Sequence, residues 1–220
     1  MMNKAKLILA GVAMAALATA LAGCAGSPQV RYYTLTAPLA PSEATPPAVG
    51  NFAIEVVSVS VPAQVDQPQL MLRSGSGQLT AQYSERWSSP LPDEFRNALS
   101  DTLTRQLGVP DVRQLAAAPG AQVWRIQVDV QRFDVSTAGP AVIDATWRVR
   151  PLQGEGGGLL CRNRVEVPVA ASTGQGLDAV VVAQQKAVAL LGLTIASAVQ
   201  SQGRQAVAAS DLVQTPRCTH

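Results

Sequence analysis

Two long segments of the sequence each present one apolar face at helical spacing, and they constrain the fold more than any other feature. The first spans residues 91–107, where apolar positions recur every four residues at Leu91, Phe95, Leu99, Leu103 and Leu107. The second spans residues 176–202, with its apolar stripe at Leu177, Val180, Val181, Val188, Leu191, Ile195 and Val199. A helix of this kind is stable only when its apolar face is buried against another layer of structure.

Strand-like segments surround both helical segments. Residues 52–61 and 142–150 alternate apolar and polar side chains, as a half-buried strand does. Residues 70–73 and 79–84 flank a Gly-Ser tip and indicate a hairpin, whereas residues 122–135, 142–150 and 159–169 indicate an antiparallel meander. We therefore expect an α/β (α+β) fold, a two-layer sandwich in which a mixed, largely antiparallel β-sheet is covered by two long helices.

The N-terminal 23 residues have the pattern of a bacterial lipoprotein signal peptide. Lys4 and Lys6 precede an apolar run that ends at Leu21 and is short for a membrane span. The tetrapeptide Leu21-Ala22-Gly23-Cys24 resembles the lipobox, in which small residues fit the peptidase and the cysteine sulfur receives diacylglycerol. We expect cleavage before Cys24 and lipidation of Cys24. The alternative is an ordinary signal peptide followed by a coincidental cysteine.

The rest of the chain divides by composition. The predicted parts are the signal peptide at 1–23, a lipidated tether with an N-terminal strand and a Pro-rich loop at 24–50, the α/β domain at 51–203 and an irregular tail at 204–220. Ala25, not Asp, follows the cysteine. By resemblance to sorted bacterial lipoproteins, this favours lipid anchoring at the periplasmic face of the outer membrane.

The charge of the mature chain argues against nucleic acid as a partner. The full sequence has 17 basic and 15 acidic residues, and removal of Lys4 and Lys6 leaves 15 of each. The remaining basic residues are scattered singly, without the basic run that is typical of a nucleic-acid-binding protein.

The cysteines suit an oxidising compartment. With Cys24 taken by lipid, Cys161 and Cys218 remain. We expect these two to form a disulfide that fastens the C-terminal tail to the domain. The alternative is two free thiols, one in a strand and one in the tail.

The sequence contains no recognisable catalytic or cofactor-binding constellation. Its single histidine is His220, so a histidine-based triad or metal centre is not expected, and we expect neither a cofactor nor a metal. The Ser74–Gly77 segment lacks the following lysine and helix of a phosphate-binding loop. The pair Asp93 and Glu94 fits an ordinary helix start. We therefore predict that the protein is not an enzyme.

The order of several motifs resembles a known family. After the lipobox come Tyr32-Tyr33-Thr34-Leu35, a valine-rich strand that ends in Val61-Pro62, the segment Asp66–Arg73, and Arg86-Trp87 before an amphipathic helix. This order is similar to that of the auxiliary lipoproteins of ABC-type and MCE-type transport systems, the paraquat-inducible protein C family. One departure is Ser88-Ser89-Pro90, at a place where the family often has an acidic residue.

The resemblance implies a non-enzymatic periplasmic subunit that docks an MCE-domain protein at the outer membrane for lipid transport, and that assembles as a homo-oligomeric ring. Two alternatives remain open: a periplasmic lipid-carrying module and a structural outer-membrane lipoprotein. From the residues themselves, we expect partner contact in the segment 65–87, at Gln69, Arg73 and Trp87. The alternative for Trp87 is a place in the core.

Overall fold

The computed structural model describes residues 29–38, 51–75, 77–136, 139–153, 157–171 and 177–220. Residues Arg31–His220 form one compact unit. The predicted signal peptide, Cys24 and most of the predicted tether lie outside the described residues. Their assignments therefore stay predictions.

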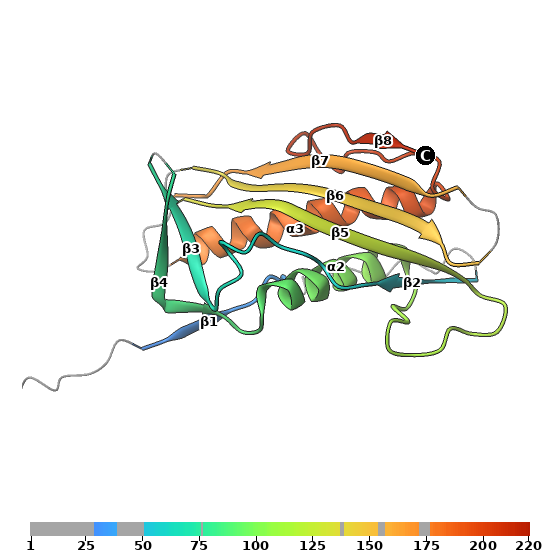
Figure 1. The fold of residues 1–220 in the computed structure, drawn as a ribbon, viewed down its shortest axis with the longest axis horizontal. Helices are drawn as coiled ribbons and strands as arrows, with labels where there is room; N and C mark the ends of the chain where they lie inside the picture. The colour runs from blue at the N-terminus through green and yellow to red at the C-terminus, as the bar shows by residue number, and fades with distance from the viewer. Residues whose placement is uncertain (1–28, 39–50, 76, 137–138, 154–156, 172–176) are drawn as a thin grey trace, which may run out of the picture. The chain divides into compact units, whose positions relative to one another are not determined.

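A five-stranded sheet forms one layer of this unit (Figure 1). Its strands are β2 (Phe52–Val56), β5 (Gln122–Asp134), β6 (Ala141–Pro151), β7 (Leu159–Val167) and β8 (Arg217–Thr219), in that spatial order. Strands β5 to β8 pair antiparallel, and β2 pairs parallel with β5. Burial alternates along β6, where Trp147 and Val149 are buried and Arg148 between them is exposed, so one face of the sheet is apolar and the other polar.

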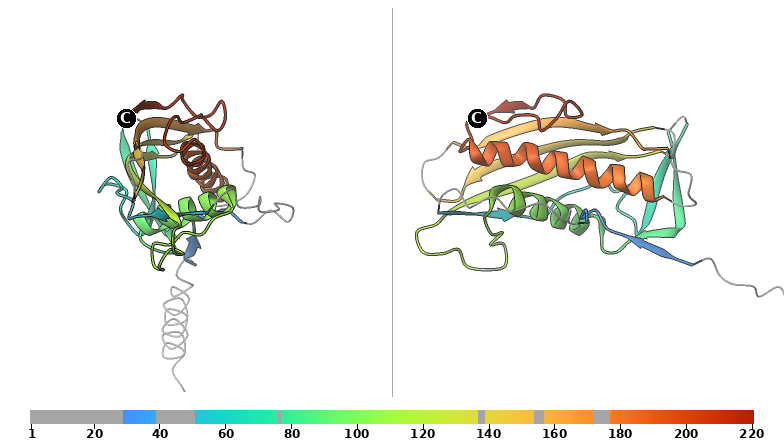
Figure 2. Two further views of the ribbon diagram at one scale, coloured as in Figure 1. Left: turned by 90° about the vertical axis from the view of Figure 1, so that its right-hand side faces the viewer. Right: turned by 180° about the vertical axis from the view of Figure 1, so that it is seen from behind.

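Two helices, α2 (Leu91–Leu107) and α3 (Asp178–Gln200), lie side by side on the apolar face of this sheet (Figures 1 and 2). They approach closely where Gly192 of α3 meets Thr102 of α2. A Cβ atom at position 192 would lie 2.9 Å from the Thr102 methyl carbon. Helix α3 is long and apolar enough to cross a membrane, but two thirds of its most apolar window is buried inside the protein. It is the central helix of the core.

A second, three-stranded sheet lies at one end of the first (Figure 1). Its order is β1 (Arg31–Tyr33), β4 (Gln78–Trp87) and β3 (Gln69–Ser74), with β1 parallel and β3 antiparallel to β4. The backbone N–H of Arg73 donates to the carbonyl oxygen of Val135, 2.8 Å away. This bond joins the small sheet to the end of the large one.

The predicted fold class is confirmed, with three differences in detail. The strands form two sheets rather than one. Strand β2 ends at Val56, after which the chain follows β5 through isolated bonds such as Ser60 N–H to Val128 C=O, 3.2 Å. The tail, expected to be irregular, contains β8, because backbone bonds and the Cys161–Cys218 pair hold it along β7.

Candidate functional site

The most elaborate polar cluster among the described residues fastens the chain's N-terminal segment to the domain. We name it the tether junction and define it as Tyr33, Thr34, Leu35, Ser88, Ser89, Glu94, Asp178 and Gln185. Its members come from β1 and the bend after it, from the turn between β4 and α2, and from both helices. The segment that leaves β1 is thereby held by three separate elements.

Glu94 is the centre of the junction, and its carboxylate is only 2% exposed. One oxygen, Oε1, accepts bonds from the Ser88 hydroxyl (2.7 Å) and from the Ser89 hydroxyl and N–H (2.7 and 3.1 Å). The other, Oε2, accepts from the Thr34 hydroxyl (2.7 Å) and the Leu35 N–H (2.8 Å). Burial alone would raise the pKa of Glu94, but these hydrogen bonds outweigh it and hold the pKa below its ordinary value. The side chain is therefore a fully satisfied buried anion.

Helix α3 holds the same segment from another side. The Tyr33 hydroxyl donates to Asp178 Oδ1 (3.0 Å), and Gln185 Nε2 donates to the Thr34 carbonyl (2.9 Å). Burial, together with hydrogen bonds to Glu85 and Asp178, raises the pKa of Tyr33 to about 12, so its hydroxyl stays a donor at neutral pH. Leu35, which follows, is 1% exposed and belongs to the core.

Sequence reasoning missed this role of Glu94, which we treated as an ordinary helix-start carboxylate. The signal was present in Ser88-Ser89-Pro90, the departure from the family pattern noted above. These two serines supply three of the five bonds to the carboxylate. Polar donors just before a helix, followed by a glutamate in its first turn, are typical of a hydrogen-bonded helix start.

The three residues for which we expected partner contact all lie on the β3–β4 hairpin, but their surroundings differ. Gln69 begins β3 and is half-buried. Trp87 ends β4, is 5% exposed and has its ring centroid 6.3 Å from that of Phe133. Trp87 therefore takes the alternative place, in the core, because its indole packs beside the Phe133 ring of β5.

Arg73, on β3, forms an ion pair within the domain. Its Nη2 lies 2.7 Å from Asp134 Oδ1, and its Nη1 donates to the Gly77 carbonyl. Asp134 is 5% exposed and also pairs with Arg132. Burial would raise the pKa of Asp134, but the two guanidinium groups lower it below the ordinary value. Arg73 therefore forms an ion pair that joins the small sheet to the large one.

The two remaining cysteines lie opposite each other in the β7–β8 ladder. Cys161 is buried, Cys218 is exposed, and their sulfur atoms are bonded at 2.03 Å. The sequence separation is 57 residues. This is the pairing that the cysteine count suggested.

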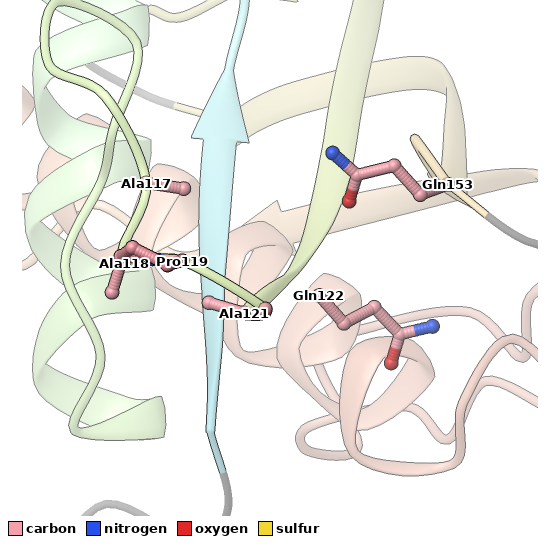
Figure 3. A pocket seen from close by; sticks show the side chains of 7 residues that line it. Ala117, Ala118, Pro119, Ala121, Gln122 and Gln153 are labelled. Carbon is pink, nitrogen blue, oxygen red and sulfur yellow. The ribbon is translucent and has the colours of Figure 1, made fainter.

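Two hollows bear on ligand binding. The first, with a volume of about 710 Å³, lies beside the loop before β5 and is lined by Ala117, Ala118, Pro119, Gly120, Ala121, Gln122 and Gln153 (Figure 3). Its lining offers no charged or nucleophilic side chain. The second lies between sheet and helices beside Trp87 and Gln184, and it has no room for a water molecule. No group of three His, Cys, Asp or Glu side chains suited to a metal occurs within the ranges that the structure describes.

Comparisons with known proteins agree with this architecture. Residues 33–196 match the family model described as the ABC-type transport auxiliary lipoprotein component. A crystal structure of a protein described only as uncharacterized superposes with a TM-score of 0.59 at 21% identity, covering 78% of this chain and 99% of the other. A Xanthomonas campestris protein of family DUF330 superposes with a TM-score of 0.53 at 18% identity, covering 80% and 95%. At these identities the two structures support the fold alone.

The comparison with curated proteins found no match. The family match, by contrast, begins at Tyr33 in the tether junction and continues through both sheets into α3. It covers far more than half of the 220 residues. The chain therefore belongs to the family of ABC-type transport auxiliary lipoprotein components.

Proposed function

We propose that this protein is an outer-membrane-anchored periplasmic lipoprotein that docks an MCE-domain protein of an ABC-type transport system for lipids. The observation that carries the proposal is the tether junction. Tyr33 and Thr34, nine and ten positions after Cys24, are fastened to Glu94, Asp178 and Gln185. A lipid anchor on Cys24 would therefore hold the folded domain close to the membrane surface.

The proposed anchor has a physical requirement. A single acyl chain gives only marginal membrane binding, whereas two or more chains hold a protein stably. A lipidated Cys24 would carry more than one chain, and the firm junction would keep the domain beside the membrane.

Cell fractionation tests the anchor. The full chain is expressed with Cys24 or with Cys24→Ala, and membranes are separated by density. We expect the parent chain in the outer-membrane fraction and the variant in the soluble periplasmic fraction. A variant that stays in the outer-membrane fraction as before contradicts the anchor, and a parent chain in the inner-membrane fraction contradicts the location.

The β3–β4 hairpin is the proposed contact with the MCE-domain protein. Tyr83 on β4 is 74% exposed and Gln69 begins β3, so both can meet a partner, whereas Trp87 cannot. Exposed tyrosines are frequent anchors of protein interfaces because they bury a large area at low entropic cost.

Pull-down of an MCE-domain protein of the same transport system tests the contact. We expect Tyr83→Ser with Gln69→Ala to weaken recovery at least tenfold. Leu115→Ser is the matched control, because Leu115 is 75% exposed but lies in the loop before β5. Equal recovery by all variants would place the contact elsewhere, and failure of the parent chain to bind would contradict the docking function itself.

We further propose that the protein acts by assembly, including a homo-oligomeric ring, and without a catalytic step. A lipid-carrying role is less well supported, because the hollow between sheet and helices has no room for water, and the larger hollow beside the loop before β5 is open to solvent rather than enclosed by the core. Light scattering of the full chain with its partner measures the assembly. A strict monomer that co-purifies with lipid and ignores the partner would favour the carrier.

A further inference from the structure

The polar face of the large sheet lies opposite the helices, and β6 stops and β7 begins at one end of this sheet (Figure 1). Four arginines lie on the polar face at that end. We name this group the arginine face and define it as Arg148, Arg150, Arg162 and Arg217. Arg148 and Arg150 alternate with the buried Trp147 and Val149 on β6, so both point away from the helices. Arg148, Arg162 and Arg217 are exposed, and Arg150 is half-buried.

The register brings like charges directly opposite one another. Arg162 of β7 faces Arg217 of β8, and Arg150 of β6 faces Arg125 of β5. Like charges in facing positions of adjacent strands are destabilising. Glu55 relieves one of these pairs by binding Arg125 at 2.6 Å, but no acidic side chain forms an ion pair with the four arginines of the face within the described part of the chain.

The opposite end of the same sheet face is balanced instead. There Asp134, Asp144 and Glu166 form ion pairs with Arg73, Arg132 and Arg164. Among the described side chains at the arginine end, five arginines, with Arg125 included, stand against Glu55 and Asp129, a formal excess of three positive charges. Asp129 is engaged by Ser60 and Gln131. The excess is therefore local and not an overall property of the sheet.

We propose that the arginine face binds an acidic surface of a protein partner. Arginine presents its N–H donors in a planar fork that matches a carboxylate, and several such forks on one flat sheet suit a row of carboxylates. The facing Arg162 and Arg217, whose like charges cost stability in the free protein, would be neutralised when the acidic surface is bound.

The position of the face favours a protein over the anchoring membrane. The small sheet and the tether junction adjoin β5 near Asp134, whereas Arg150 faces Arg125, nine residues earlier on that strand. Nine residues of strand span about 30 Å. The face thus lies far along the sheet from the end that the tether enters. This choice of occupant rests on the proposed lipid anchor, whereas the arginine face itself does not.

A second copy of the chain is a poorer occupant. Face-to-face stacking would set the arginine end of one copy against either the arginine end or the balanced end of the other. In the first arrangement the two arginine faces repel each other, and in the second the excess positive charge of each face is not neutralised. An acidic surface supplied by another protein removes both difficulties.

Binding of a fluorescent decaglutamate peptide tests the proposal. The protein is the compact unit Arg31–His220, which lacks both the apolar leader and Cys24, so that any vesicle binding is a property of the folded domain. Arg148→Glu with Arg162→Glu is expected to weaken peptide binding at least tenfold, and binding of the parent should weaken as salt rises. The matched control is Arg113→Glu with Arg204→Glu, which changes two exposed arginines outside the face and should alter binding less than twofold.

Two further measurements distinguish loss of peptide binding from loss of stability, and a protein partner from a membrane. Arg217→Glu alone turns a facing like-charge pair into an opposite-charge pair, so it should weaken peptide binding without lowering the Tm. Sedimentation with vesicles that contain phosphatidylglycerol tests a phosphate-bearing membrane as the occupant. The proposal is overturned if the peptide does not bind, if the control variant loses binding equally, or if only the vesicles bind through the arginine face.

Discussion

Glu94 Oε2 accepts a 2.8 Å hydrogen bond from the backbone N–H of Leu35, a residue 59 positions earlier in the chain. The carboxylate lies in the first turn of α2, where the positive end of the helix dipole favours it. Because Leu35 lies two residues after the end of β1, this bond couples the entry of the chain into the domain to the start of the first long helix. The start of α2 and the attachment of the tether therefore both depend on the Glu94 carboxylate.

Glu94→Gln should reduce the free energy of unfolding by about 2 kcal/mol, because an amide presents N–H groups to donors that expect an acceptor. Urea unfolding at pH 7 measures the loss. Asp93→Asn is the matched control: Asp93 is also in the first turn but is exposed, and its change should cost less than about 0.5 kcal/mol. Equal losses for the two variants would assign the effect to the helix dipole.

The same carboxylate predicts a pH dependence. The pKa of Glu94 is lower in the folded than in the unfolded protein, so the unfolded chain takes up the proton first. Its contribution to stability is present above the unfolded value of about 4.3 and is lost as pH falls through the lower, folded value. Urea midpoints should therefore fall less between pH 7 and pH 3 in Glu94→Gln than in the parent. Parallel curves would contradict this assignment.

Gly192→Val should lower the free energy of unfolding by about 2–3 kcal/mol. A Cβ atom at this position would lie 2.9 Å from the Thr102 methyl carbon and 3.1 Å from its Cβ, so the two helices must move apart. Lys186→Val is the control, since Lys186 is exposed on the same helix and loses only helix propensity. Thermal unfolding compares the two variants, and a similar Tm for both would mean that the contact can relax.

The sequence predicted the layers well and the polar network poorly, for physical reasons. Period-four apolar positions such as Phe95 and Leu99 determine which helix face is buried, so α2 was found with its observed ends. Hydrogen bonds between Thr34 and Glu94 join residues 60 positions apart, and no local pattern encodes that distance. The arginine face was missed for the same reason, because single arginines on β6, β7 and β8 become neighbours only through register.

Trp87 shows how an ambiguous residue is decided by its surroundings. An aromatic residue before a helix fits either a contact surface or a core. The alternation of burial along β4 and the nearby Phe133 ring place it in the core. Its position in the sequence alone could not separate the two roles.

The Cys161–Cys218 bond should hold β8 on the sheet. Replacing both cysteines with alanine is expected to lower the free energy of unfolding by about 4 kcal/mol, the loop-entropy value for the observed separation of 57 residues. Mass spectrometry without reduction should find the intact chain lighter by two hydrogen atoms than the reduced one. Alkylation of both thiols in the unreduced protein would contradict the bond.

Arg73→Met should destabilise the protein through Asp134 rather than weaken a partner contact directly. Asp134 is 5% exposed, and loss of Arg73 leaves Arg132 as its remaining ion-pair partner among the described residues. Because a buried carboxylate with a lost partner is costly, we expect a decrease of about 2 kcal/mol in the free energy of unfolding.

A double-mutant cycle with Asp134→Asn isolates the pair. Once the buried charge is gone, Arg73→Met should cost much less than in the parent, so the two changes should be non-additive by at least about 1 kcal/mol. Arg86→Met, on the neighbouring strand and without an ion pair among the described residues, should be additive with Asp134→Asn. If Arg73→Met instead leaves stability unchanged but abolishes recovery of the partner, the residue acts at the docking surface, and the ion pair is incidental to the fold.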